Sequence, residues 1–181
     1  MIHYRAFILV LLLFSCDNSE PKIQTYRLAK VPQENLKSQT NSELAFKNTK
    51  IPETWESIAP GPFQLRLFKV KGTPIEELEV SISYLPYTAG KELDNINRWR
   101  SQIKLPPITE SEAKQSKQVN RNNIGAYSYF DFESDIPNGE AISIAYQVYD
   151  QGHLFVKLKG LKSHVHKERE TFTKFLQMLK E

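Results

Sequence analysis

Cysteine is the scarcest residue in this 181-residue sequence, which contains only Cys16. An internal disulfide is therefore excluded, and packing must stabilise the folded part of the chain. Zinc is disfavoured as well, because a zinc site needs three or four convergent ligands. His164 and His166 would diverge by about 200° on a helix, and His153 lies on a separate predicted strand. We predict neither a metal site nor a cofactor.

Long apolar runs are also missing. A permanent transmembrane helix needs roughly 20 apolar residues, and the run at residues 6–14 is much shorter. It follows a basic start that ends in Arg5, which is typical of a secretory signal peptide. Leu13-Phe14-Ser15-Cys16 closes the run and resembles the lipobox of bacterial lipoproteins.

The lipobox implies that diacylglycerol alkylates the Cys16 thiol, that the chain is cut after Ser15, and that Cys16 becomes the new N-terminus. Two or more acyl chains hold a protein durably on a membrane. We therefore expect a lipid-anchored protein on the extracytoplasmic side of the cell membrane or of the outer membrane.

A large excess of one charge sign is absent, since the net charge is +3 and Arg5 would leave with the signal peptide. Nucleic-acid binding is therefore disfavoured. Nucleophilic catalysis lacks its usual marks, because there is no Gly-x-Ser-x-Gly elbow and Cys16 would carry lipid. We expect the partners to be the membrane, through the lipid anchor, and an envelope protein. Basic residues predict a positive end of the domain, formed by Lys157, Lys159, Lys162, Lys167 and Arg169.

The pattern divides the chain into a signal peptide (1–15), a lipidated cysteine and tether (16–22), an N-terminal strand and loop (23–50) and a globular domain (51–181). Alternating apolar residues predict strands over 23–29, 63–70, 78–85, 119–132, 141–149 and 153–159. Spacings of three and four predict helices over 89–104 and 163–180, and a helical turn lies near 42–46. Residues 109–112 have the capping-box form, which predicts a further short helix. This order defines an α+β domain, an antiparallel sheet packed against helices.

The densest polar motif lies on the predicted helix over 89–104. Helical spacing puts Asn95, Arg98 and Gln102 on one exposed stripe, while Trp99 turns toward the sheet. Arginines beside a large aromatic residue can bind a carboxylate or phosphate, or anchor a protein partner. The candidate binding surface comprises Asn95, Asn97, Arg98, Trp99, Arg100 and Gln102. A structural role is the alternative, with Trp99 in the core, Asp94 paired to Arg98 and Arg100 bonded to loop carbonyls.

The run from Asn95 to Gln102, followed by Leu105-Pro106-Pro107, resembles the Asn-x-Asn-Arg-Trp-Arg-x-Gln signature of an uncharacterised family of bacterial envelope lipoproteins. The Trp55 segment, the strand over residues 155–160 and the closing helix are similar too. The resemblance implies the fold of the PsbP photosystem extrinsic proteins and of the Ran-binding nuclear import factor. It implies no activity, because a fold by itself does not supply one.

Acidic residues alternate at Asp131, Glu133 and Asp135, as they do where a calcium loop begins. Ile136-Pro137 then stands where an EF-hand needs glycine, so we interpret the segment as a polar turn. The sequence favours a non-catalytic binding or accessory domain over an enzyme. The alternative is a small-ligand or enzymatic domain with a pocket between the 89–104 helix and the sheet.

Overall fold

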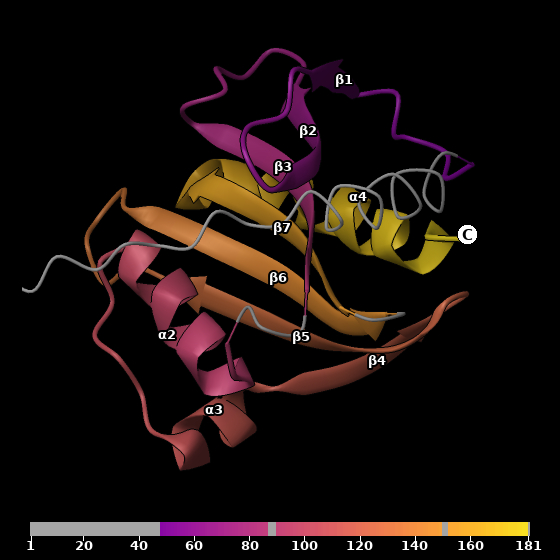
Figure 1. Cartoon of the computed structure of the whole chain (residues 1–181). Helices are drawn as coiled ribbons and strands as arrows, with labels where there is room; N and C mark the ends of the chain where they lie inside the picture. The colour runs from indigo at the N-terminus through magenta and orange to yellow at the C-terminus, as the bar shows by residue number, and fades with distance from the viewer. Residues whose placement is uncertain (1–47, 87–89, 150–151, 181) are drawn as a thin grey trace, which may run out of the picture. The chain divides into compact units, whose positions relative to one another are not determined.

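The computed structural model describes residues 48–86, 90–149 and 152–180, all of which belong to the compact unit formed by residues 32–181 (Figure 1). Its strands are β1 (Trp55–Ile58), β2 (Gln64–Val70), β3 (Leu78–Pro86), β4 (Gln118–Asn122), β5 (Gly125–Glu133), β6 (Glu140–Tyr149) and β7 (Gly152–Leu161). Its helices are α2 (Glu92–Gln102), α3 (Glu110–Ser116) and α4 (Lys162–Met178).

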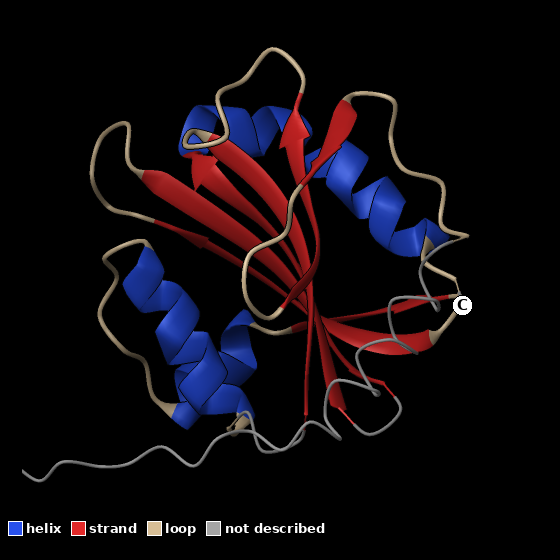
Figure 2. Cartoon of the chain, turned by 45° about the horizontal axis from the view of Figure 1, so that its top comes forward, coloured by secondary structure: helices blue, strands red, loops and turns tan. Residues whose placement is uncertain are grey.

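The seven strands form one antiparallel sheet in the order β1-β2-β3-β7-β6-β5-β4. Helices α2 and α3 lie on one face of this sheet and α4 lies on the other (Figure 2). The α+β class, with an antiparallel sheet packed against helices, is therefore confirmed.

Each face of the sheet carries its own core, because successive side chains of a strand point to opposite faces. On β6, Ile142 and Ile144 pack in the core under α2 and α3, whereas Ala141 and Ala145 pack in the core under α4. The apolar stripe predicted for the terminal helix is confirmed. Its members are all buried against the sheet: Phe172, Phe175, Leu176 and Leu179.

One expectation about the strands was wrong, and one strand was not predicted. The single strand expected over 119–132 is the β4–β5 hairpin, whose turn forms because the Asn122 side chain accepts a hydrogen bond from the Ile124 N–H at 3.0 Å. Gly125 follows with φ of 132°, a backbone conformation that favours glycine. The edge strand β1 had no prediction, since its four residues are too few to show a sustained alternation.

Helix α2 is shorter at both ends than the predicted helix over 89–104. Helix α4 begins one residue before the predicted helix over 163–180 and ends two residues before its end. Cys16, the strand over 23–29, the turn near 42–46 and the beginning of the 89–104 helix at residue 89 lie outside the described residues. Within the part of the chain that the structure describes, no helix combines the length and the apolar character needed to cross a bilayer.

Candidate functional site

Helix α2 carries the polar motif and is fixed to the sheet by Trp99, whose exposed fraction is 2%. The indole lies 5.6 Å from the Phe155 ring, 6.0 Å from the Phe130 ring and 6.5 Å from the Tyr146 ring, measured between centroids. The helix ends where Lys104 takes a left-handed backbone conformation with φ of 62°. The prediction that Trp99 fills the core is confirmed.

Two motif residues hold the loop between α2 and α3. The Asn97 side chain donates to the Ile108 carbonyl at 3.1 Å and accepts from the Ile108 N–H at 2.8 Å. The Arg100 Nε donates to the Pro106 carbonyl at 2.9 Å, and its guanidinium lies 5.1 Å from the centre of the Phe132 ring. The structural alternative is therefore confirmed for Arg100, and Asn97 has the same kind of role.

The exposed stripe predicted on α2 is wrong at Asn95, which is 1% exposed. Its amide donates to the Lys91 carbonyl at 3.1 Å, and its side-chain oxygen accepts a hydrogen bond from Arg98. Arg98 thus bonds to Asn95 rather than to Asp94, which accepts from the Lys91 N–H at 3.3 Å. Only Arg98 and Gln102 of the expected stripe are exposed.

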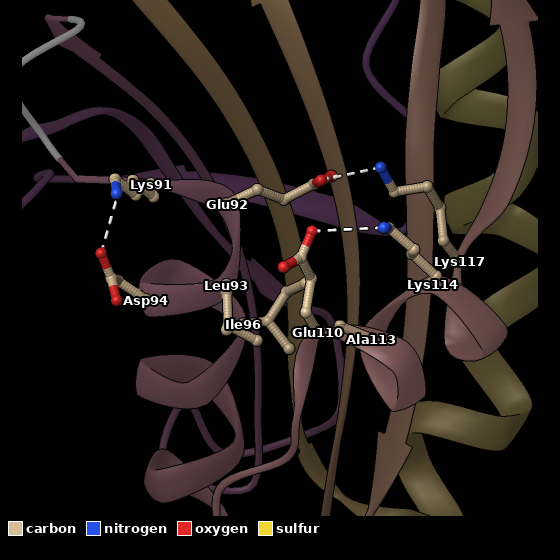
Figure 3. Close-up of a pocket in the computed structure, with 9 residues that line it drawn as sticks. All are labelled: Lys91, Glu92, Leu93, Asp94, Ile96, Glu110, Ala113, Lys114 and Lys117. Atoms are coloured by element: carbon tan, nitrogen blue, oxygen red, sulfur yellow. Dashed lines mark hydrogen bonds and ion pairs between the residues drawn. The ribbon is translucent and has the colours of Figure 1, made fainter.

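The largest of the described cavities, of about 550 Å³, lies between α2 and α3 (Figure 3). Leu93, Ile96 and Ala113 form its apolar wall. Glu92 of α2 pairs with Lys117, just after α3, across its mouth at 2.7 Å, and Glu110 pairs with Lys114 one turn further along α3 at 3.2 Å. These charges already compensate one another, so the cavity presents little unpaired charge to a ligand.

The helix that borders this cavity, α3, begins at the predicted capping box. The Thr109 N–H donates to the Glu112 carboxylate at 2.8 Å, and the Glu112 N–H donates to the Thr109 hydroxyl at 3.4 Å. The Thr109 hydrogen bonds lower the pKa of Glu112. Ile108 and Ala113 pack in the same core, as the sequence predicted for a hydrophobic staple.

A second polar group lies on the sheet face that carries α2. Ser81 of β3 and Lys157 of β7 are directly opposite in the strand register, so their side chains share one face. Phe155, two residues before Lys157, packs in the core under α2, which identifies that face. The Ser81 Oγ is buried and has no hydrogen-bond partner. We call this pair the Ser81–Lys157 patch.

Lys157 differs from the neighbouring Lys159 in that its pKa is lowered and it has no ion pair among the described residues. Burial lowers the pKa of Lys157, Glu79 opposes that change, and the positive charges of Lys159 and Arg98 add to it. Lys159 is itself paired with Glu140 at 3.2 Å. Among the described residues Lys157 has neither a hydrogen bond nor an ion pair. A lysine and an unpartnered hydroxyl at opposite register positions on one sheet face are chemically suited to hold an anion.

The acidic segment 131–135 is only in part the polar turn that we expected: Asp131 and Glu133 lie within β5 and face α4, whereas Asp135 lies in the turn that joins β5 to β6. Glu133 accepts from His166 at 2.6 Å and from Arg169 at 3.1 Å. His164 instead contacts Glu77 at 3.1 Å. In residues 48–86, 90–149 and 152–180 no group of three or more His, Cys, Asp or Glu side chains is placed to hold a metal ion.

The sequence predicted a strand over 78–85, which contains Ser81, and placed Lys157 at a positive end of the domain, but it did not bring the two residues together. Their proximity depends on the register of β3 against β7, two strands separated by most of the domain. Only long-range pairing information could have predicted it.

One antiparallel sheet with a helical layer on each face defines the class of this domain. Among solved structures, it is similar to cyanobacterial PsbP (CyanoP) from Synechocystis sp. PCC 6803, at 11% identity over 71% of this chain and 82% of that chain, with a TM-score of 0.41. LpqN, involved in cell envelope biogenesis of Mycobacterium tuberculosis, is similar at 8% identity over 74% of this chain and 79% of that chain, with a TM-score of 0.33. No family model and no curated protein sequence matches the chain. Similarities this distant assign no role to any residue.

Proposed function

We propose that this chain is a lipid-anchored protein of a bacterial cell envelope, and that its folded domain is a non-catalytic module that binds an envelope protein. Leu13-Phe14-Ser15-Cys16 supports the anchor, because this tetrapeptide has the lipobox form. The Ser81–Lys157 patch supports the binding role. The partner group would be a carboxylate of an acidic side chain.

The observation that carries the binding proposal is the unpartnered, buried Ser81 Oγ on β3, directly opposite Lys157 in the strand register. A buried polar group without a partner costs about 1–3 kcal/mol, so folded proteins rarely retain one without a reason. A carboxylate could accept from the Ser81 hydroxyl and from the Lys157 ammonium together. Arg98, on the exposed side of α2, adds positive potential to the same region.

The second candidate is a small-ligand or enzymatic domain that uses the cavity between α2 and α3. Its volume of about 550 Å³ favours this candidate, since cavities of roughly 300–1,000 Å³ hold small molecules. The Glu92–Lys117 ion pair across its mouth disfavours it, because an incoming charged group would have to displace that pair. The binding module is therefore the function that the geometry supports best.

Labelling the protein with a fatty acid in a bacterial host tests the anchor. Cys16→Ser should abolish acyl labelling and release the protein from the membrane fraction, because lipid attachment needs the thiol. Lys22→Ala, in the predicted tether, is the control and should keep both properties. Lipid labelling that persists in Cys16→Ser would refute the anchor.

Ser81→Ala and Lys157→Met test the binding patch. Both should fold at least as well as the parent, because each removes a buried polar group that lacks a partner. Both should weaken binding of acetate, followed by nuclear magnetic resonance shifts of the β3 and β7 amides. Lys159→Met is the matched control, since Lys159 is already paired with Glu140.

The same variants are then compared in crosslinked pull-downs from envelope membranes. Loss of one defined protein partner in Ser81→Ala and Lys157→Met, but not in Lys159→Met, would support the proposal. Well-folded variants that bind acetate and retain every partner would reject the patch as the binding site. A signal from acetate alone, without a protein partner, would reject the envelope-protein part of the proposal.

A further inference from the structure

A separate cavity, of about 330 Å³, lies on the opposite face of the sheet, between the β4–β5 hairpin and α4. We call it the hairpin trough. Its walls come from three elements: Gln118 and Asn120 from β4, Tyr127 and Tyr129 from β5, and Thr173 and Gln177 from α4. The C-terminal end of α4 lies near the turn of the hairpin (Figure 1).

Hydrogen bonds fix both ends of the hairpin trough. At the turn, the Asn123 amide donates to the Gln177 carbonyl of α4 at 3.2 Å. At the other end Asp131 accepts from the Ser143 hydroxyl and from the Tyr129 hydroxyl, the latter at 3.1 Å. The walls are therefore held in place before any ligand arrives, which lowers the entropic cost of binding.

The trough has one paired arginine, Arg169, and one arginine without an ion pair among the described residues, Arg121. Arg169 lies 3.5 Å from Asp131 through its Nε and 3.1 Å from Glu133 through a terminal nitrogen. Hydrogen bonds from His166 and Arg169 lower the pKa of Glu133, which favours the charged carboxylate that pairs with Arg169. Arg121 lines the trough as well, is exposed, and has no ion pair among the described residues. The interior is thus polar without a strong net charge.

Several uncharged polar groups of the trough have no hydrogen-bond partner within the described residues. They are the hydroxyl of Tyr127 and the side-chain amides of Gln118, Asn120 and Gln177, three exposed residues whose amides are free to exchange water for a ligand. Tyr127 is only 4% exposed, so most of its ring is buried. Burial raises the pKa of Tyr127 and raises that of Tyr129 to about 12, so both hydroxyls stay protonated at physiological pH.

We propose that the hairpin trough binds a small uncharged molecule rich in hydroxyl groups, such as a sugar unit. Each sugar hydroxyl both donates and accepts a hydrogen bond, and side-chain amides and tyrosine hydroxyls offer both functions. An anion would meet Arg169 already paired with Asp131 and Glu133, although the buried Arg169 Nε makes no hydrogen bond and the exposed Arg121 has no ion pair among the described residues, so anions are the competing ligand class that phosphate and acetate test. An apolar molecule would leave the amides and the Tyr127 hydroxyl unpaired, which is costly. A volume of about 330 Å³ is at the lower end of the range for small-molecule sites.

Glucose and N-acetylglucosamine, titrated to high millimolar concentration, are the probes. Nitrogen-15 spectra follow the side-chain amides of Gln118, Asn120 and Gln177 directly. We expect at least one sugar to shift these three signals in a saturable manner. Inorganic phosphate and acetate, the anionic probes, should leave them unchanged.

Asn120→Ala combined with Gln177→Ala should weaken sugar binding about tenfold, the effect of losing one or two hydrogen bonds. Tyr127→Phe keeps the ring and removes the hydroxyl, so it should weaken binding in the same direction. Gln102→Ala is the matched control, because Gln102 is an exposed amide on α2, across the sheet. It should bind sugar like the parent.

The proposal is overturned if neither sugar shifts the trough amides, or if phosphate shifts them and the sugars do not. Equal binding by Gln102→Ala and by the Asn120 and Gln177 variant would also overturn it. Ser81→Ala should bind sugar normally, because Ser81 lies on the other face. A failure of the trough is therefore distinguishable from a failure of the Ser81–Lys157 patch.

Discussion

Trp99→Ala is the sharpest test of how α2 is attached to the sheet. Replacement of a buried tryptophan or phenylalanine by alanine costs about 3–5 kcal/mol. Trp99 is 2% exposed, and its ring neighbours Phe130 and Phe155 are held on strands, so the structure can close little of the cavity left behind. We therefore expect a loss of about 4–5 kcal/mol in the free energy of unfolding, at the upper end of that range.

Urea denaturation measures this loss. With a denaturant slope of about 1–3 kcal/mol per molar urea, a loss of about 4 kcal/mol lowers the midpoint by roughly 1.3–4 M. Far-ultraviolet circular dichroism follows the whole domain, and fluorescence of Trp55 follows the other core. Trp55 is suited to this purpose because it lies 4.9 Å from the Phe175 ring of α4 and donates to Glu168 at 2.7 Å.

The two probes should report one transition, because both cores share the strands of a single sheet. Trp99→Phe should lose less stability than Trp99→Ala, since it keeps part of the aromatic packing. A Trp99→Ala variant with the parental midpoint would refute the burial argument. A Trp55 transition that stays at the parental urea concentration while circular dichroism shifts would refute the shared unfolding of the two cores.

Three further predictions concern single positions. Asn97→Ala should lower the free energy of unfolding by about 1–3 kcal/mol in urea denaturation, because two backbone groups of the α2–α3 loop lose their partner; a change below about 0.5 kcal/mol, as for an ordinary surface site, would contradict that role. Gly160→Ala should fail to give a parental melting temperature, because the new Cβ would collide with the Glu77 carbonyl oxygen, and normal melting would show that this strand contact is looser than described. Glu133 has its pKa lowered from 4.5, first by its hydrogen bond to His166, so its stabilisation is present above about pH 4.5 and is lost as the pH falls through the lowered value. In Glu133→Gln, the free energy of unfolding should therefore fall less steeply below about pH 4.5 than in the parent. The same steepness in both proteins would contradict a stabilising role of the Glu133 carboxylate.

Local periodicity predicted most of the helices and strands, because burial on one face leaves a regular pattern in the sequence. The stripe of α4 and the burial of Trp99 are examples. Periodicity failed at the β4–β5 hairpin, where Asn122 and Gly125 make the turn inside a run with strand character. It also failed at Asn95, whose amide is polar yet buried because it satisfies backbone groups at the start of α2.

The site residues were harder to predict than the fold. The motif over residues 95–102 is dense in Arg, Asn and Trp, which predicted a binding surface. In the structure, most of these side chains instead hold α2 on the sheet or fix the loop that follows it. The hairpin trough and the Ser81–Lys157 patch draw on residues of no local distinction. The register of β3 against β7 brings the residues of the patch together, and the packing of α4 on the sheet brings those of the trough together. A short segment of sequence carries no information on either arrangement.

The position of β7 has a consequence for how the chain becomes folded. Among the strands of residues 48–86, 90–149 and 152–180, β7 is the last in the sequence, yet it lies between β3 and β6 and joins the β1–β3 meander to the β4–β6 meander. Until residues 152–161 are available, the two meanders share no backbone ladder, and each exposes an open strand edge. A chain that emerges from its N-terminus onward must therefore wait for its last strand before the sheet can close, and this late, long-range pairing should slow folding.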